Sequence, residues 1–352
     1  MKELVRVVGR ERPDEPADRI RVAILDTGVD VTHDDLHSPW LSGQIVYQNF
    51  VGTRSDIPQD DDGHGTHVTS ILLQMAENVD IYVARVSPDG LKWNSSEVED
   101  VRIFYDHCYQ FHHITLPCVC LTNFEQAIRW ATKEKQVHII SISFGFPNAD
   151  QSLEGIRKVL LEAHAADVLI FAATGNVAAG NAISFPACLD EVISVSSTDG
   201  NHELSKFVPD LRVGKRLCAI GEAIEAAWTD QKGSNLPIHS STRRKAGTSY
   251  ATPVVAGVAA MVMDLIWSDV ENFEYQCQTL RTNRGMLAVL ELMIWKNKDN
   301  GIECLKPWMF FNKKRWKPFS KNKKPAAGMR VANFVILADT LNNIYGKGSS
   351  KT

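Results

Sequence analysis

Three segments, far apart in the chain, each carry a side chain that can take part in nucleophilic catalysis. Ser249 lies in AGTSYATPVVAG at the start of a long apolar run, and His64 lies between two glycines in DDDGHGTHV. Asp26 follows the apolar run IRVAIL directly. An imidazole can take the proton of a serine hydroxyl, and a carboxylate can hold that imidazole in the required orientation. These residue types predict catalysis by a serine nucleophile.

A fourth segment, FAATGNVAAG, places Asn176 directly after another apolar run. A side-chain amide at the end of a strand can donate a hydrogen bond to the oxyanion of a tetrahedral intermediate. Loss of one such donor costs about 3 to 4 kcal/mol of transition-state stabilisation. The backbone N–H of Ser249, at a helix N-terminus, is a second candidate donor. Asn176 and Ser249 together predict an oxyanion hole.

Each segment has another interpretation when it is taken alone. The DTG triplet that begins at Asp26 is also typical of a structural turn or of an aspartic protease, and Ser249 could simply cap a helix. His64 and His67 are three positions apart with no glutamate between them, whereas a zinc-binding helix uses histidines four apart. We therefore expect no metal at this pair, and we expect His67 to be a packed, hydrogen-bonded helix residue.

Short, continuously apolar runs alternate with segments of helical periodicity, as in a parallel sheet covered on both faces. This order predicts an α/β fold with a doubly wound, mostly parallel sheet flanked by helices. Ligands in such folds bind beyond the carboxyl ends of the strands, where the four segments would meet. The expected strands are 20–25, 79–86, 137–144, 167–173 and 191–197, and the expected helices begin near His64, Phe124 and Leu153 and after Ser249.

The four segments occur in the order Asp, His, Asn, Ser, and they resemble the subtilisin-like serine protease family (peptidase S8). Chymotrypsin-like enzymes place the histidine first and α/β-hydrolases place the serine first, so this order favours the family. The resemblance implies a serine endopeptidase with the subtilisin-like fold, in which Asp26, His64 and Ser249 form the catalytic triad. It also implies that Asn176 and Thr248 assist the oxyanion and that catalysis requires no metal or other cofactor.

The resemblance further implies that an extended polypeptide substrate pairs as an added strand with one edge of the site. The family usually has a second glycine where this chain has Phe146. We therefore expect this wall of the substrate groove to be narrower or displaced, and we expect an apolar or aromatic P1 residue. The candidate substrate-binding residues are Ser143, Phe144, Gly145 and Phe146 on one side and Ala172, Ala173, Thr174 and Gly175 on the other.

Residues 101–123, VRIFYDHCYQFHHITLPCVCLTN, interrupt the pattern just before the helix expected near Phe124. Their histidines and cysteines lack the spacing of zinc ligands. We interpret the segment as a retained intron. Residues 101–103 can be encoded by a nucleotide sequence that resembles a splice donor, and residues 121–122 by one that resembles a branch site. Its removal joins SSEVED to FEQAIRWA and gives a helix start with acidic residues in the first turn. If the segment is present in the protein, it would lie beside the substrate groove and could block or regulate it. The alternative function is therefore a catalytically silent or gated regulatory module.

Composition limits the domain organisation and the partners. The chain has 352 residues, 38 Lys and Arg against 42 Asp and Glu, and a net charge of −4, so we expect no nucleic acid as a partner. We expect an N-terminal extension (1–19), a subtilisin-like catalytic domain (20–275) and a C-terminal helical and basic extension (276–352). The resemblance covers roughly residues 20–265. The expected partners are polypeptide substrates and other domains of a larger protein.

The sequence also bears on the cellular location of the protein and on its capacity to bind ions. No apolar run approaches the roughly 20 residues that span a bilayer, and the N-terminus lacks the apolar stretch of a signal peptide. We therefore expect no membrane association, a cytoplasmic location and reduced cysteines, with Cys218 a small buried side chain. No calcium-binding loop can be matched. Asp60, Asp61 and Asp62 could bind a cation, but the favoured interpretation is a solvated loop.

Overall fold

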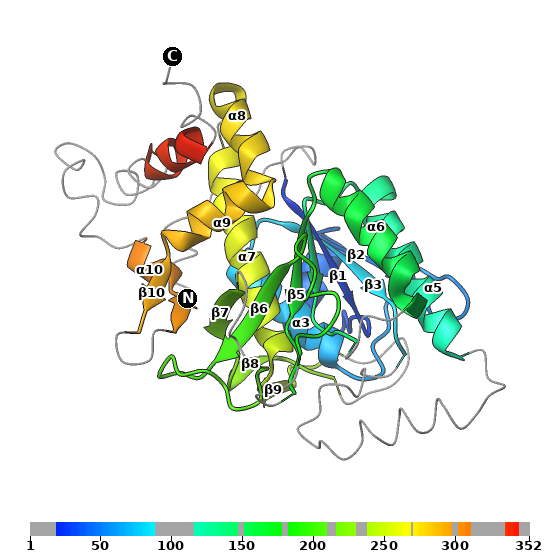
Figure 1. Ribbon diagram of the computed structural model, residues 1–352. Coiled ribbons are helices and arrows are strands. Elements are labelled where there is room, and N and C mark those ends of the chain that lie inside the picture. The colour runs from blue at the N-terminus through cyan, green and yellow to red at the C-terminus, as the bar shows by residue number, and fades with distance from the viewer. Residues whose placement is uncertain are drawn as a thin grey trace.

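A nine-stranded sheet forms the centre of the structure (Figure 1). The computed structural model describes residues 19–88, 116–146, 151–177, 182–209, 216–229, 238–268, 270–297, 302–310 and 335–344. The strands of this sheet are β1 (Arg21–Asp26), β2 (Ile45–Asn49), β3 (Asp80–Arg85), β4 (Ile139–Ile142), β5 (Leu169–Ala173), β6 (Ile193–Thr198), β7 (Arg216–Ile220), β10 (Ile294–Lys296) and β11 (Glu303–Leu305). A separate antiparallel pair consists of β8 (Ile224–Ala227) and β9 (Thr242–Lys245).

The strand order in the large sheet is β10-β11-β7-β6-β5-β4-β1-β3-β2. Neighbouring strands are parallel, except that β10 is antiparallel to β11. The residues of β4 and β5 are buried throughout, because helices cover both faces of a parallel sheet, and this explains their continuous apolar sequences. The predicted doubly wound, mostly parallel α/β sheet is confirmed.

Helices pack on the two faces of the sheet. In Figure 1, α5 and α6 lie together on one face, while α7 and α3 lie on the other. Each face has its own apolar core. The helices are α2 (Asp34–Leu41), α3 (His64–Met75), α5 (Leu116–Arg129), α6 (Glu154–Ala165), α7 (Thr248–Trp267), α8 (Val270–Leu280), α9 (Asn283–Glu291) and α10 (Pro307–Phe310), with a π-helical turn η3 (Trp130–Glu134), a 3₁₀ turn η4 (Gln151–Leu153) and a helical segment at 335–344.

The strand order reverses direction at β1. From β1 the chain adds β3 and β2 on one side and β4, β5, β6 and β7 on the other. The carboxyl ends of parallel strands meet at one edge of a sheet, and the point of reversal is where α/β folds bind their ligands. Asp26 ends β1, while Ser143 follows β4 and Asn176 follows β5 shortly after their last residues. The topology therefore brings the predicted site residues to one edge.

Helix α7 runs through the middle of the core on one face of the sheet. Within the part of the chain that the structure describes, it is the one helix long and apolar enough to cross a membrane, and that window is completely buried in protein. The sequence-based expectation that no apolar run reaches such a length is therefore wrong. A helix that is apolar all round is also the pattern of a fully buried core helix, and burial accounts for the composition of α7.

The start of one helix differs from the expected position, and one expected domain boundary falls within a helix. Helix α5 begins at Leu116, inside the segment 101–123, rather than near Phe124. The domain boundary expected at residue 275 falls inside α8, and β11 pairs with β7 through Cys304 and Cys218. The C-terminal part thus extends the same sheet and contributes to the same core. The N-terminal extension up to residue 18, residues 101–115 and most of the basic stretch lie outside the described residues.

Candidate active site

Asp26 and His64 meet where β1 ends and α3 begins. Gly63 turns the chain into α3 at φ +97°, a left-handed conformation that favours glycine. His64 Nδ1 lies 2.7 Å from Asp26 Oδ1, and the backbone N–H of Thr27 donates to the same oxygen at 2.8 Å. Asp26 is almost completely buried, with 2% of its surface exposed. The carboxylate is therefore rigidly placed to orient the His64 ring.

The contact with Asp26 affects the pKa of His64 and its tautomer. Burial lowers the pKa of His64, but the charge of Asp26 and the hydrogen bond to it outweigh burial, so the pKa lies above its ordinary value. When Nδ1–H donates to Asp26, the other ring nitrogen carries the lone pair that can accept a proton. That nitrogen, Nε2, is buried and has no hydrogen-bond partner among the described residues. It makes no hydrogen bond to Ser249 Oγ here, and catalytic hydrogen bonds are often long before substrate binds.

Ser249 is the second residue of α7 and is completely buried. Its neighbour Tyr250 packs against His64, with ring centroids 5.4 Å apart, and against His67 at 4.8 Å. The start of α7 therefore lies against the start of α3. At the N-terminus of a helix, the dipole and the backbone N–H groups favour negative charge, which is the charge that would develop on a carbonyl oxygen attacked by Ser249.

Asn176 is hydrogen-bonded to Thr248, the residue that precedes the candidate nucleophile. Its Oδ1 accepts the backbone N–H of Thr248 at 2.8 Å and the Thr248 hydroxyl at 3.1 Å. The backbone N–H of Gly175 donates to the same hydroxyl oxygen at 3.3 Å. Because Oδ1 is held in this way, the amide nitrogen Nδ2 is the atom left to donate to a ligand. The two residues predicted to assist an oxyanion are thus in direct contact.

The predicted substrate edge is only partly available for main-chain pairing. Ser143 and Phe144 are buried, and Gly145 is half-buried. Phe146 exchanges two backbone hydrogen bonds with Phe185, at 2.7 and 2.8 Å. Its N–H is therefore already paired, which removes Phe146 from the set of residues expected to pair with a substrate main chain. Residues 143–145 are the remaining members of the expected set.

The opposite side of the predicted groove is also well packed. Ala173 and Thr174 are fully buried, and the backbone N–H of Thr174 donates to the Val195 carbonyl oxygen at 3.0 Å. Gly175 has φ +101°, and an added Cβ there would lie 2.4 Å from Ser184 Oγ. Glycine is therefore required at this turn, which leads directly to Asn176.

The acidic run before His64 differs from the expected solvated loop. Asp60 has only 2% of its surface exposed, and Asp61 Oδ2 lies 2.6 Å from Arg85 Nη2. The sequence-based expectation is therefore wrong for Asp60. Among the described residues, no group of three His, Cys, Asp or Glu side chains is arranged to hold a metal ion. His67 is buried and its Nε2 lies 3.1 Å from the Arg243 carbonyl oxygen, which confirms the prediction of a packed, hydrogen-bonded residue.

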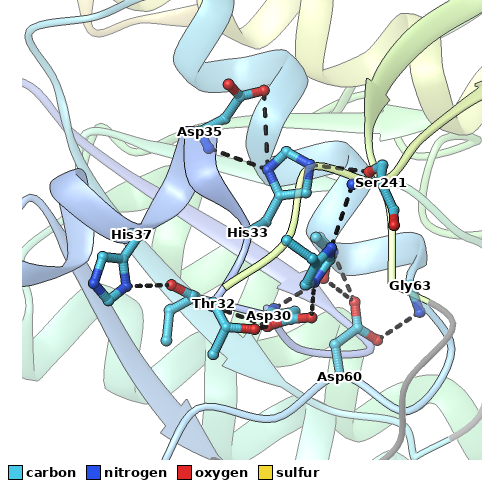
Figure 2. Close-up of polar contacts among 11 residues, drawn as sticks. Asp30, Thr32, His33, Asp35, His37, Asp60, Gly63 and Ser241 are labelled. Carbon is cyan, nitrogen blue, oxygen red and sulfur yellow. Dashed lines mark hydrogen bonds and ion pairs between the residues drawn. The ribbon is translucent and has the colours of Figure 1, made fainter. Parts of the chain in front are cut away.

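Figure 2 shows a polar cluster that the sequence analysis missed. His33 Nε2 lies 2.9 Å from the Ser241 carbonyl oxygen (Figure 2). His239 Nε2 lies 2.8 Å from Asp30 Oδ2. The backbone N–H of Asp30 also donates to the Thr66 hydroxyl on α3 at 2.9 Å. These contacts hold the segment before β9 against the loop after β1. No local pattern could reveal them, because His239 and Asp30 are 209 positions apart.

A doubly wound sheet with a histidine–carboxylate contact at its carboxyl edge is an arrangement found in serine hydrolases. A sequence model of the subtilase family matches residues 17–286. This match spans most of the chain, and the protein belongs to the subtilase family of serine peptidases. The resemblance stated from the motifs is thereby confirmed.

Three curated relatives illustrate the similarity. "Subtilisin-like protease het-Q2" of Podospora anserina is 26% identical over 77% of this chain and 75% of its own length. Subtilisin Savinase of Lederbergia lenta is 29% identical over 72% of this chain and 80% of its own length. The "Major intracellular serine protease" of Bacillus subtilis (strain 168) is 30% identical over 69% of this chain and 68% of its own length. These identities support serine peptidase activity in general terms.

Solved structures show the same fold. A cold adapted subtilisin-like serine proteinase aligns with a TM-score of 0.57 and 21% identity, covering 87% of this chain and 96% of its own. The prenylagaramide maturation protease PagA aligns with a TM-score of 0.58 and 20% identity, covering 95% of this chain and 98% of its own. At these identities the likeness concerns the fold alone.

Proposed function

We propose that the protein is a serine endopeptidase that hydrolyses polypeptides through an acyl-enzyme. The observation that carries this proposal is the 2.7 Å contact between His64 Nδ1 and Asp26 Oδ1. This contact selects the tautomer in which Nε2 accepts a proton, and the Tyr250 contact brings the start of α7 beside the same ring. Ser249 directly precedes Tyr250 in the chain, and we assign it as the nucleophile.

The reaction uses groups of this chain alone. Ser249 Oγ attacks the carbonyl carbon of the scissile bond, and its proton passes to His64 Nε2. The oxyanion accepts hydrogen bonds from Asn176 Nδ2 and the Ser249 backbone N–H. The C–N bond then breaks as His64 gives its proton to the leaving amine. Water attacks the resulting ester with His64 again acting as the base, which releases the acid and restores the serine hydroxyl.

The substrate is an extended polypeptide whose main chain pairs with residues 143–145 and whose P1 side chain is apolar or aromatic. Residues 173–175 form the opposite wall, and their burial supports an apolar environment. We also propose a cytoplasmic location, catalysis without a metal or other cofactor, and other domains of a larger protein as partners. Cleavage of a peptide library by purified protein tests the P1 preference, and a preference for charged P1 residues would contradict it.

A fluorophosphonate probe, which reacts with activated serines, tests the assignment of the nucleophile. Wild-type protein should be labelled, whereas Ser249→Ala should not be, with its circular dichroism spectrum unchanged. Ser241→Ala is the matched control, because Ser241 is exposed on the segment that leads toward α7, and this variant should be labelled like wild type. Equal labelling of Ser249→Ala would overturn the assignment.

A gated or catalytically silent subtilase is the second candidate, because His64 Nε2 makes no hydrogen bond to Ser249 here. Segment 101–123 is the proposed gate, and α5 begins within it. For a gated enzyme, the full chain should resist labelling and deletion of 101–123 should restore it. Equal labelling of both forms would contradict gating. Comparison of genomic DNA with spliced transcript tests whether the segment is a retained intron.

A further inference from the structure

Asp60 is a buried carboxylate that the proposed mechanism does not use. Its side chain accepts five hydrogen bonds. Among the described residues it forms no salt bridge with Lys or Arg, and the neighbouring Arg85 pairs with Asp61. Burial raises the pKa of Asp60, and the surrounding donors oppose that rise. A buried carboxylate is costly unless its hydrogen bonds are satisfied, so the placement of these donors is the feature to explain.

The two oxygens of Asp60 bind opposite ends of the turn that carries His64. Oδ1 accepts the backbone N–H groups of Gly63 at 2.9 Å and Asp62 at 3.2 Å. Oδ2 accepts both the backbone N–H of Thr66 at 2.8 Å and its hydroxyl at 2.5 Å. Figure 2 shows the contact between Asp60 and Gly63. Asp60 thus holds the residues on both sides of His64.

Thr27 connects the same carboxylate to Asp26. Its hydroxyl donates to Asp60 Oδ1 at 2.9 Å and accepts the backbone N–H of Gly65 at 2.9 Å. Its own backbone N–H donates to Asp26 Oδ1, the oxygen that contacts His64. A continuous set of hydrogen bonds therefore runs from Asp60 to both partners of the Asp26–His64 contact.

We propose that Asp60, acting through Thr27, is a positioning residue for proton transfer in the reaction proposed above. It fixes the turn of His64 relative to the end of β1, so that the imidazole meets Asp26 in the productive orientation. A displacement of a catalytic group by about 1 Å can cost 100-fold in rate. The inference rests on the proposed function, but it adds a residue outside the triad and the oxyanion hole.

Asp60→Asn and Thr27→Val test the proposal in the full chain. The asparagine retains one oxygen acceptor and loses the other, and the valine keeps a similar shape without a hydroxyl. Each variant should lower kcat about 100-fold with KM nearly unchanged. Thr27→Ser keeps the hydroxyl and should restore nearly wild-type kcat. The double variant should be little worse than either single variant, because both break the same set of hydrogen bonds.

Two further readouts separate positioning from a purely structural role. In Thr27→Val the apparent pKa of the acidic limb of kcat/KM should fall, because a misplaced Asp26 stabilises the His64 cation less. The low-field proton NMR signal of the Nδ1–H···Oδ1 hydrogen bond should shift or broaden in both single variants and return in Thr27→Ser. If Asp60→Asn fails to fold, Thr27→Val with its serine control decides the question.

The outcomes distinguish this inference from the proposed function. The positioning role alone would be overturned by the following result. The wild-type protein hydrolyses peptides, and Asp60→Asn and Thr27→Val lose thermal stability but keep the wild-type kcat, pH profile and NMR signal. Folded wild-type protein that neither hydrolyses peptides nor reacts with the probe, even after deletion of 101–123, would overturn the proposed function. In that case the NMR signal still reports whether Asp60 and Thr27 hold His64 against Asp26.

Discussion

Asn176 Oδ1 accepts two hydrogen bonds from Thr248, one from its backbone nitrogen and one from its hydroxyl. These bonds join the turn after β5 to the first residue of α7. Because the oxygen is engaged, the amide nitrogen is held in a single orientation before any substrate arrives. Preorganised donors of this kind need no rearrangement when charge develops in the transition state.

Asn176→Ala should therefore lower kcat about 100- to 1,000-fold with little change in KM, because an oxyanion donor acts mainly in the transition state. Steady-state hydrolysis of a chromogenic peptide measures both constants. Thr248→Ser is the control that keeps the hydroxyl bonded to Asn176, and it should retain most of the activity. A large rise in KM with unchanged kcat in Asn176→Ala would instead indicate a role in ground-state binding.

The pH dependence of catalysis should reflect the contact between Asp26 and His64. His64 must be neutral to accept a proton, and its pKa lies above the ordinary histidine value because Asp26 outweighs burial. Activity is then present above this raised pKa and is lost as the pH falls through it. Asp26→Asn should lower kcat about 10⁴-fold through the wrong tautomer, and the acidic limb should move to lower pH. A limb that does not move would exclude Asp26 as its cause.

Acid stability should depend on His67. Burial lowers the pKa of His67 to about 4, whereas the unfolded chain binds this proton near pH 6.5. The unfolded state therefore takes up the proton first as the pH falls, and the free energy of unfolding should decrease by roughly 3 kcal/mol between about pH 6.5 and 4. Urea unfolding at several pH values measures this effect.

His67→Gln should flatten that part of the stability curve, since glutamine does not titrate and can still donate to the Arg243 carbonyl oxygen. His164→Gln, which changes a partly exposed histidine near the end of α6, serves as the control and should leave the wild-type curve in place. An unchanged slope in His67→Gln would show that other groups dominate acid unfolding.

The crossing of α3 and α7 should be sensitive to one added methyl group. A Cβ built on Gly257 would lie 2.4 Å from Met75 Cβ. Gly257→Ala should therefore reduce the free energy of unfolding by roughly 1 to 3 kcal/mol through overpacking, although alanine is the better helix former. Gly200→Ala, where nothing lies within 4 Å of an added Cβ, is the control. Equal or greater stability of Gly257→Ala would show that the helices can move apart.

The sequence alone predicted the α/β class and the five central strands, each to within two residues of its observed ends. These features depend on local patterns, since continuous apolar runs mark buried parallel strands and glycines mark the turns around His64 and Asn176. The order of the motifs was enough to indicate the family. The start of α5 was predicted too late, and the addition of β10 and β11 to the sheet was not foreseen, because short strands at a sheet edge carry little periodicity.

Only the tertiary structure decided which polar groups are buried and bonded. The sequence placed Asp60 in a run of three aspartates, which is usually solvated, whereas the fold turned it inward toward Thr27 and Thr66. The backbone pairing of Phe146 with Phe185 and the contact of Asp30 with His239 likewise join segments that are distant along the chain. Local propensity acts over a few residues, but the position of a hydrogen-bond partner depends on how whole strands and helices pack.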